Sequence, residues 1–235
     1  MYQKNWDKFY RRTYRLSGKK ALWDVPPEAS VAQDFELFKK HLKSELSIID
    51  IGCGIGSQSF FLAKHFKSVL GVDVAKEAIK IAKNNLVTPN VQFEVVDLTQ
   101  PFSDFNTVEI NLPCNIYMRG VLHQIKEEHL SNFQDNLLKV MDGSGRMYLV
   151  EVADSIHTYV DKLSTGFSQL PIQLRQTFIS HLPPKGLSLN NLNDFFPTSQ
   201  FKILKSGNTG LNTNIQLSDM KPIIIPAVYA VLEKA

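Results

Sequence analysis

Residues 48–66, IIDIGCGIGSQSFFLAKHF, hold three glycines at alternating positions, Gly52, Gly54 and Gly56. An apolar run typical of a buried strand precedes the glycines, and a segment typical of a helix follows them. Glycines allow close approach to the backbone and permit positive φ angles. In an open α/β sheet, the turn after the first strand lies where ligands bind, and the next helix offers its amino end to an anion. The stretch therefore predicts a ligand site on an α/β fold.

The glycine spacing argues against a dinucleotide. The dinucleotide fingerprint is G-x-G-x-x-G, which would require a third glycine at position 57 or 59. Ser57 and Ser59 stand there instead. Asp50, two residues before the first glycine, is awkward beside a pyrophosphate but suits a positively charged group such as an amine. These residues favour a ligand with a cationic end.

Two further acids follow the next strand-like segments. Asp73 ends the segment SVLGVDV, where a carboxylate can bind both hydroxyls of a ribose. Asp97 ends VQFEVVDL, where a carboxylate can accept a hydrogen bond from an adenine amine. Three converging acids would repel phosphates, so the site suits a nucleoside without phosphate.

The rest of residues 45–153 alternates strand-like and helix-like segments, which indicates a doubly wound, mostly parallel sheet in a three-layer sandwich. Helices are expected over 29–43, 57–66, 75–86, 127–141 and 188–196, and the irregular segment 155–186 also looks helical. Residues 201–211 and 223–234 read as the last two strands, joined by a polar loop rich in Gly and Asn. We expect one domain over 1–235.

Composition is that of a globular protein, with 43% hydrophobic and 21% charged residues. No apolar run approaches the roughly 18 residues of a membrane span, and no secretion signal is evident. Cys53 and Cys114 read as free thiols in a reducing compartment, which predicts a cytoplasmic protein without a membrane partner. No metal site is expected.

The ordered motifs DIGCGIG, LGVDVAKEAIKIAKNN, FEVVDL, RGVLHQI and GSGRMYLVEV resemble those of class I S-adenosylmethionine-dependent methyltransferases. The resemblance covers about residues 45–153. It implies S-adenosylmethionine as cofactor and a seven-stranded Rossmann-like sheet in the order 3-2-1-4-5-7-6, with the last strand antiparallel. It also implies a cofactor site made of Asp50, Gly52, Cys53, Gly54, Gly56, Gln58, Asp73, Val74, Asp97, Leu98 and Arg119.

The resemblance implies methyl transfer to an acceptor that the motifs do not identify. His123 in VLHQI is the candidate catalytic base, with a packed structural histidine as the alternative. The separated glycines Gly143 and Gly145 depart from the usual adjacent pair. A Cys114 nucleophile is a remote alternative, and NLPC only faintly resembles the motif of amino-methylating nucleic-acid enzymes.

Most of the acceptor pocket is expected from segments outside the shared core, 1–24 and 155–190, which belong to an amino-terminal arm over 1–44 and a helical insertion over 155–190. The opening segment WDKFY…ALWDVPP resembles that of small-molecule methyltransferases of the thiopurine and tellurite-resistance type, which predicts a helical lid. Residues 1–20 also carry seven basic side chains and one acid, so an RNA or other nucleic-acid methyltransferase is an alternative. An NAD-dependent dehydrogenase and a non-catalytic S-adenosylmethionine binder are the remaining alternatives.

Overall fold

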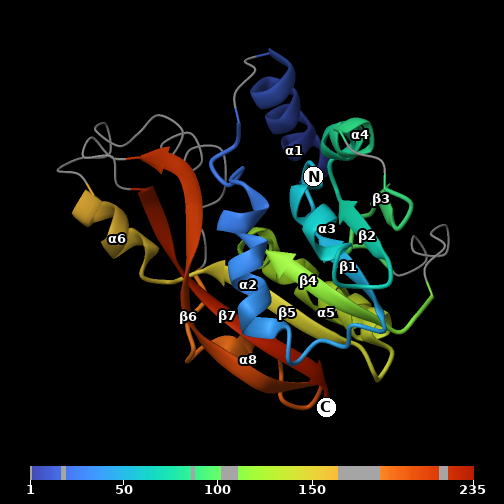
Figure 1. Cartoon of the computed structure of the whole chain (residues 1–235). Helices are drawn as coiled ribbons and strands as arrows, with labels where there is room; N and C mark the ends of the chain where they lie inside the picture. The colour runs from blue at the N-terminus through green and yellow to red at the C-terminus, as the bar shows by residue number, and fades with distance from the viewer. Residues whose placement is uncertain (1, 17–19, 86–87, 102–110, 164–185, 217–221) are drawn as a thin grey trace.

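The computed structural model describes residues 2–16, 20–85, 88–101, 111–163, 186–216 and 222–235, which form a seven-stranded sheet between layers of helices (Figure 1). The strand order is β3-β2-β1-β4-β5-β7-β6, as expected. Strands β1 to β5 pair in parallel, whereas β7 is antiparallel to both β5 and β6. The strands are β1 Ser47–Ile51, β2 Val69–Asp73, β3 Val91–Val95, β4 Cys114–Arg119, β5 Arg146–Val152, β6 Phe201–Gln216 and β7 Pro222–Lys234.

The apolar side chains of the strands alternate between two cores. Ile49 contributes to a core that also contains Phe133 and Leu137 of α5, whereas Ile48 contributes to a core with Phe38 of α2 and Leu62 of α3. This two-sided burial explains the near-continuous apolar runs of the central strands. The α-helices are α1 Tyr2–Tyr10, α2 Val31–Phe38, α3 Ser57–Leu62, α4 Lys76–Asn85, α5 Glu127–Met141, α6 Ile156–Leu163 and α8 Leu192–Phe195, and the short helices are η1 Arg11–Leu16, η2 Pro27–Ala29 and η4 Leu122–Gln124.

The polar loop predicted between the last two strands is shorter than expected, because residues 212–216 continue the long strand β6, while 217–221 lie outside the described residues. Strand β6 pairs with β7 from Phe201 to Gln216, with two register shifts. Tertiary contacts override the local preference of these residues: Asn212 Nδ2 donates to the Ala29 carbonyl at 2.7 Å, and Asn214 Nδ2 donates to the Ala21 carbonyl at 2.6 Å. The strand thereby fastens the amino-terminal segment to the sheet.

Several helices are shorter than predicted. The expected helix over 188–196 reduces to α8, because the Asn191 side chain accepts a hydrogen bond from the Ser188 backbone N–H at 2.8 Å and so stabilises a turn before the helix begins. The expected helix over 29–43 is helical over Val31–Phe38. Of the segment 155–186, residues 156–163 form α6, while 164–185 lie outside the described residues. None of the described helices is both long and apolar enough to cross a membrane.

Candidate active site

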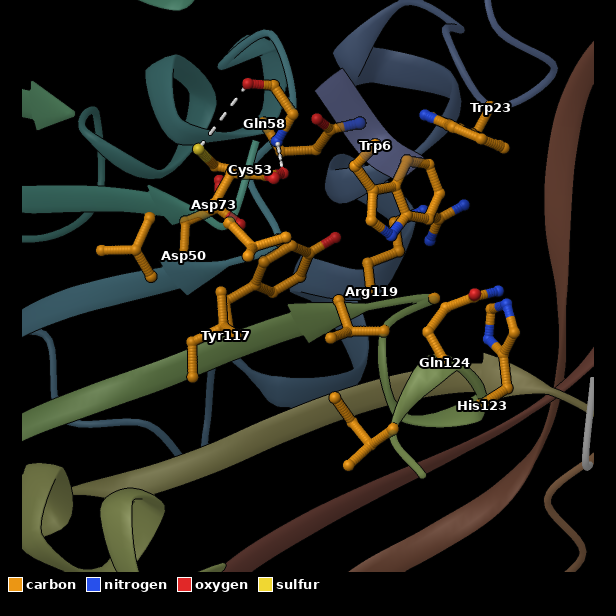
Figure 2. Close-up of a pocket in the computed structure, with 18 of the residues that line it drawn as sticks. Trp6, Trp23, Asp50, Cys53, Gln58, Asp73, Tyr117, Arg119, His123 and Gln124 are labelled. Carbon is orange, nitrogen blue, oxygen red and sulfur yellow. Dashed lines mark hydrogen bonds between the residues drawn. The ribbon is translucent and has the colours of Figure 1, made fainter. Parts of the chain in front are cut away.

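One cavity opens at the carboxyl ends of β1, β2 and β4, the place that the strand order predicts for a ligand (Figure 2). It brings together nearly all the side chains singled out from the sequence. The predicted residues that line it are Asp50, Gly52, Cys53, Gly54, Gln58, Asp73, Val74, Asp97, Leu98, Arg119 and His123.

The glycine loop between β1 and α3 has the left-handed backbone that its composition predicts. Gly52, Gly54 and Gly56 have φ angles of +73°, +56° and +85°. The three differ in what a Cβ would meet: Val121 at 2.4 Å for Gly52, the Tyr10 hydroxyl at 2.9 Å for Gly54, and the Phe93 ring at 2.5 Å for Gly56. Gly56 is not among the cavity-lining residues, so in this structure its small size serves packing between the loop and β3.

Asp50 lies on β1 beneath the loop and is 2% exposed. Its Oδ2 accepts a hydrogen bond of 2.6 Å from the Ser59 hydroxyl on α3. Burial raises the pKa of Asp50 to about 7; the Ser59 hydrogen bond opposes that rise and the neighbouring Asp73 charge adds to it. The carboxyl group is therefore poised to ionise fully when a cationic or hydrogen-bond-donating ligand arrives.

Asp73, the last residue of β2, ties the glycine loop to the second strand. Its Oδ2 accepts from the Gly54 backbone N–H at 3.0 Å, and its Oδ1 accepts from the Ala75 backbone N–H at 2.8 Å. Burial raises its pKa to about 6, although the hydrogen bonds from Ala75 and Gly54 lower it. The side chain thus lies at the junction of the loop, the strand and the cavity.

Asp97 follows β3 by two residues and shapes its own turn. Its Oδ1 accepts from the Thr99 backbone N–H at 3.0 Å and from the Thr99 hydroxyl at 2.6 Å. Asn136 of α5 donates to the Leu98 carbonyl at 2.8 Å and holds the same turn from below. Asp97 and Leu98 are consequently fixed at the edge of the cavity.

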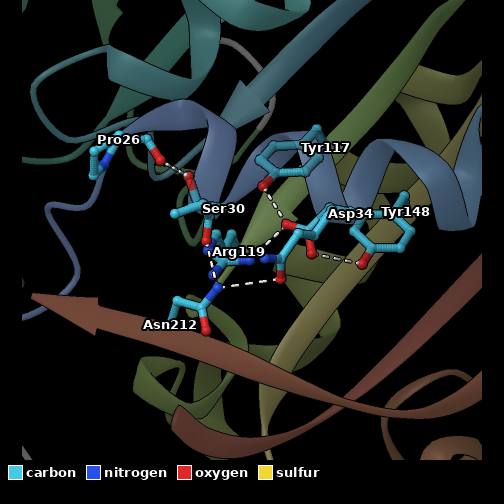
Figure 3. A network of polar contacts seen from close by, with 9 residues as sticks. Pro26, Ser30, Asp34, Tyr117, Arg119, Tyr148 and Asn212 are labelled. Atoms are coloured by element: carbon cyan, nitrogen blue, oxygen red, sulfur yellow. Dashed lines mark hydrogen bonds and ion pairs between the residues drawn. The ribbon is translucent and has the colours of Figure 1, made fainter. Parts of the chain in front are cut away.

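Arg119, at the end of β4, belongs to a buried network that sequence reasoning missed (Figure 3). Its Nη1 lies 2.6 Å from Oδ2 of Asp34 on α2. The same oxygen accepts from the Tyr117 hydroxyl at 2.7 Å, and Oδ1 of Asp34 accepts from the Tyr148 hydroxyl at 3.1 Å. Burial lowers the pKa of Arg119, but the charge and hydrogen bond of Asp34, together with Tyr117 and Tyr148, outweigh that effect and the net shift is upward. Asp34 therefore neutralises a cation that would otherwise repel a positively charged ligand.

His123, on η4 just after β4, pairs with a second residue that sequence reasoning missed. Its Nδ1 lies 2.5 Å from Oε1 of Glu151, which is 1% exposed and stands near the end of β5. The signal for Glu151 was present in the sequence: it is a lone acid within the apolar run MYLVEVA. Cys114, the remote nucleophile candidate, is fully buried and absent from the cavity lining.

The amino-terminal helix α1 covers the glycine loop. Tyr10 is 3% exposed and packs with Ala75 and Ala78 at the start of α4. Asp7 Oδ1 accepts from the Glu77 backbone N–H at 3.0 Å, in the first turn of α4. Arg11 forms an ion pair with the Glu77 side chain at 3.2 Å, so part of the basic arm is engaged within the molecule.

The two ends of the cavity differ in chemistry (Figure 2). We call the end formed by Asp50, Asp73 and Asp97 the acid end. The other, the aromatic end, is formed by Trp6, Trp23, Leu22, Val152, Ile225 and His123. There the Trp6 and Trp23 rings meet edge to face with centroids 5.9 Å apart.

The arrangement fits S-adenosylmethionine. Three carboxyl groups at successive strand ends suit hydroxyl, amine and ammonium donors, and the single described arginine of the lining is already paired with Asp34. The positive-φ loop lines the same cavity, with Gly52 and Gly54 contributing backbone to its wall. A phosphate-bearing dinucleotide would meet acids instead of cations.

Comparisons with known proteins agree with this geometry. Residues 48–145 match the family model described as "Methyltransferase domain". A solved S-adenosylmethionine-dependent methyltransferase from Anabaena variabilis superimposes with a TM-score of 0.89 and 28% identity, covering 99% of this chain and 95% of that one.

Two curated relatives match over shorter stretches. An uncharacterized RNA methyltransferase from Oceanobacillus iheyensis is 37% identical over 93 residues, 38% of this chain and 20% of the relative. Phosphoethanolamine N-methyltransferase 3 from Arabidopsis thaliana is 31% identical over 90 residues, 37% of this chain and 17% of the relative. The chain thus spans only about a fifth of these curated relatives.

Residues 48–145 are thus matched as a methyltransferase domain, and the sheet order and the Anabaena structure support a class I S-adenosylmethionine-dependent methyltransferase.

Proposed function

We propose that the protein transfers a methyl group from S-adenosylmethionine to a small molecule. The observation that carries this proposal is the division of one cavity into an acid end, with Asp50 and Asp73, and an aromatic end, with Trp6, Trp23 and His123 (Figure 2). S-adenosylmethionine, when bound, supplies a methyl group already activated by the positive sulfonium. The protein's part is to hold the two reactants in line, which can lower a barrier by several kcal/mol.

We assign the cofactor to the acid end. Asp73 would bind the ribose hydroxyls, with Val74 beside the adenine, and Asp97 and Leu98 would bind the adenine edge and face. Asp50 and the loop from Gly52 to Gly54 would surround the methionine portion, with Gln58 at the start of α3. This assignment is supported by the burial of Asp50 and Asp73 and by the cavity-facing position of each residue.

The amino-terminal segment would act as the lid over this site. Its support is the pair of contacts that Asp7 of α1 and Arg11 of η1 make with α4, which we call the latch. The position of Tyr10 over Gly54 supports it as well. A small acceptor would then contact the aromatic end beneath the lid.

Methyl-labelled S-adenosylmethionine provides the test. The protein is incubated separately with a small-molecule extract and with total RNA, and Asp73→Asn serves as the blank. Label entering the small-molecule fraction with the wild type but not with Asp73→Asn supports the proposal. Label entering RNA alone would overturn the choice of acceptor.

RNA methylation is the second candidate, favoured by the description of the Oceanobacillus relative and by the basic residues of the amino-terminal arm. Binding through phosphates weakens steeply with salt, by about one power of the salt concentration for each phosphate contact. A steep salt dependence of RNA binding would support this candidate, whereas no binding at low salt would remove it.

A further inference from the structure

Glu151 accepts hydrogen bonds from three backbone N–H groups and faces a ring nitrogen of His123. Its Oε2 accepts from the backbone N–H of Leu122 at 2.5 Å and of His123 at 3.4 Å. Its Oε1 accepts from the Val152 backbone N–H at 3.0 Å and faces His123 Nδ1 at 2.5 Å. Because a carboxylate only accepts, this pairing requires the proton of a neutral His123 ring to lie on Nδ1 and leaves the lone pair on Nε2.

The fold holds this pair rigidly at the wall of the cavity. Strands β4 and β5 run side by side in parallel, with Arg119 opposite Val150. The turn after β4 is fastened by a 2.9 Å hydrogen bond from the Gly120 N–H to the Val150 carbonyl, and η4 begins over Glu151. His123 itself lines the aromatic end, next to Gln124 (Figure 2).

The charges around the cavity disfavour an anionic acceptor. Among the described lining residues, Arg119 is the single arginine or lysine, and Asp34 pairs with it. The acids Asp24, Asp50 and Asp73 also line the cavity and would repel a carboxylate or phosphate. A charged head group would further have to leave water for the apolar wall of the aromatic end, which is unfavourable for an ion without a partner of opposite charge.

We propose that Glu151 positions His123 to accept the proton of a hydroxyl group on a neutral acceptor with an aromatic or apolar body. In this step, which rests on the proposed function, the acceptor oxygen forms a bond to the methyl carbon while the bond from carbon to sulfur breaks. The hydroxyl proton passes to His123 Nε2, and S-adenosylhomocysteine is released uncharged at sulfur. The imidazolium that results faces the Glu151 carboxylate, which stabilises its charge.

The experiment uses full-length protein saturated with S-adenosylhomocysteine, with saturation verified by calorimetry. Three probes share one aromatic body: 2-naphthol, 2-naphthoate and 2-naphthylmethylammonium. Their affinities are measured by titration near neutral pH, and nitrogen-15 NMR reports which ring nitrogen of His123 carries the proton. The variants are Glu151→Leu and Glu151→Gln, and Gln124→Ala is the matched control beside His123.

We expect the wild type to carry the His123 proton on Nδ1 and to bind 2-naphthol at least about tenfold more tightly than either charged probe. Addition of 2-naphthol should shift the Nε2 resonance. Glu151→Leu and Glu151→Gln should lose the Nδ1 preference and weaken 2-naphthol binding about tenfold, whereas Gln124→Ala should keep the tautomer.

Three results would overturn the inference: a wild-type proton on Nε2, a charged probe that binds as tightly as 2-naphthol, or no binding by any probe. If a Glu151 variant fails to fold, the wild-type tautomer and probe ranking still decide the question. Failure of S-adenosylhomocysteine to bind would instead contradict the proposed function, so the two failures are distinguishable.

Discussion

The acid end and the aromatic end of the cavity are built in different ways. Each acid of the acid end lies at or just beyond the carboxyl end of its own strand. Asp50, Asp73 and Asp97 converge because the carboxyl ends of parallel strands meet at one edge of the sheet. The second end is assembled from the amino-terminal segment, η4, β5 and the final hairpin. The proposed cofactor site is therefore a property of the sheet, whereas the proposed acceptor site depends on the segments that cover it.

The largest effect is expected at the acid end. Asp73→Ala should weaken S-adenosylhomocysteine binding by at least about 100-fold, because two charge-assisted hydrogen bonds to the ribose would be lost. Calorimetry measures the affinity, and circular dichroism verifies the fold, since the Gly54 and Ala75 N–H groups also lose a partner. Exposed Asp135→Ala is the control. Unchanged affinity in Asp73→Ala would mean that the ribose assignment is wrong.

The next largest effect is expected in the pH dependence of cofactor affinity, which depends on the carboxyl groups of the acid end. Asp50 and Asp73 have pKa values raised to about 7 and about 6 in the unliganded protein. A ligand that donates hydrogen bonds or carries a positive charge needs both groups ionised. S-adenosylhomocysteine affinity should therefore fall at least about tenfold from pH 8 to pH 5, as both groups become protonated.

The stability of the unliganded protein should respond in the opposite sense. For an acid whose folded pKa is raised, the stabilising contribution is fully present below its ordinary pKa and is lost as the pH rises through the folded value. Asp50→Asn should reduce the change near pH 7 in both the stability and the S-adenosylhomocysteine affinity. Thermal unfolding across pH measures the first, and calorimetry across pH measures the second. Identical profiles for wild type and Asp50→Asn would contradict the burial argument.

Substitution at the aromatic end should change the affinity for the cofactor product little. Trp23→Ala should weaken 2-naphthol binding to the S-adenosylhomocysteine complex about tenfold, because a large, partly buried ring of the cavity wall is removed. The affinity for S-adenosylhomocysteine itself should change less than about threefold. A greater effect on the cofactor than on the probe would show that the division into two ends is misplaced.

The smallest effect is expected at the latch between α1 and α4. Asp7→Ala removes an acceptor from the first turn of α4, which should cost about 1 kcal/mol in the free energy of unfolding. If α1 is a lid, release of S-adenosylhomocysteine should also accelerate by about threefold, as measured by stopped-flow. Asp161→Ala, on exposed α6, is the control, and equal release rates in the two variants would argue against a lid.

The same contrast explains what the sequence could predict. The alternation of strands and helices and the acid end follow from short local patterns, because each acid lies beside the strand that positions it, whereas the strand order was implied by the resemblance to class I methyltransferases. The pair of His123 and Glu151 is separated by 28 residues and depends on β4 lying beside β5. Asp34, which neutralises Arg119, lies 85 residues away on a helix whose packing no local pattern specifies.

The polar stretch of β6 shows the same limit. Its glycines and asparagines favour a loop locally, yet pairing with β7 and hydrogen bonds to the amino-terminal segment make it a strand. The residues that link β6 to the amino-terminal segment, Asn212 and Asn214, contact carbonyl groups more than 180 residues earlier in the chain. Interactions of that range are decided by the assembled fold.

The most direct test of the central claim is a pair of calorimetric titrations of the full-length protein, one with S-adenosylhomocysteine and one with NAD. The three acids, and the absence of the last glycine of the dinucleotide fingerprint G-x-G-x-x-G, predict one binding site for S-adenosylhomocysteine and no measurable binding of NAD. Binding of NAD without binding of S-adenosylhomocysteine would contradict the assignment of the acid end.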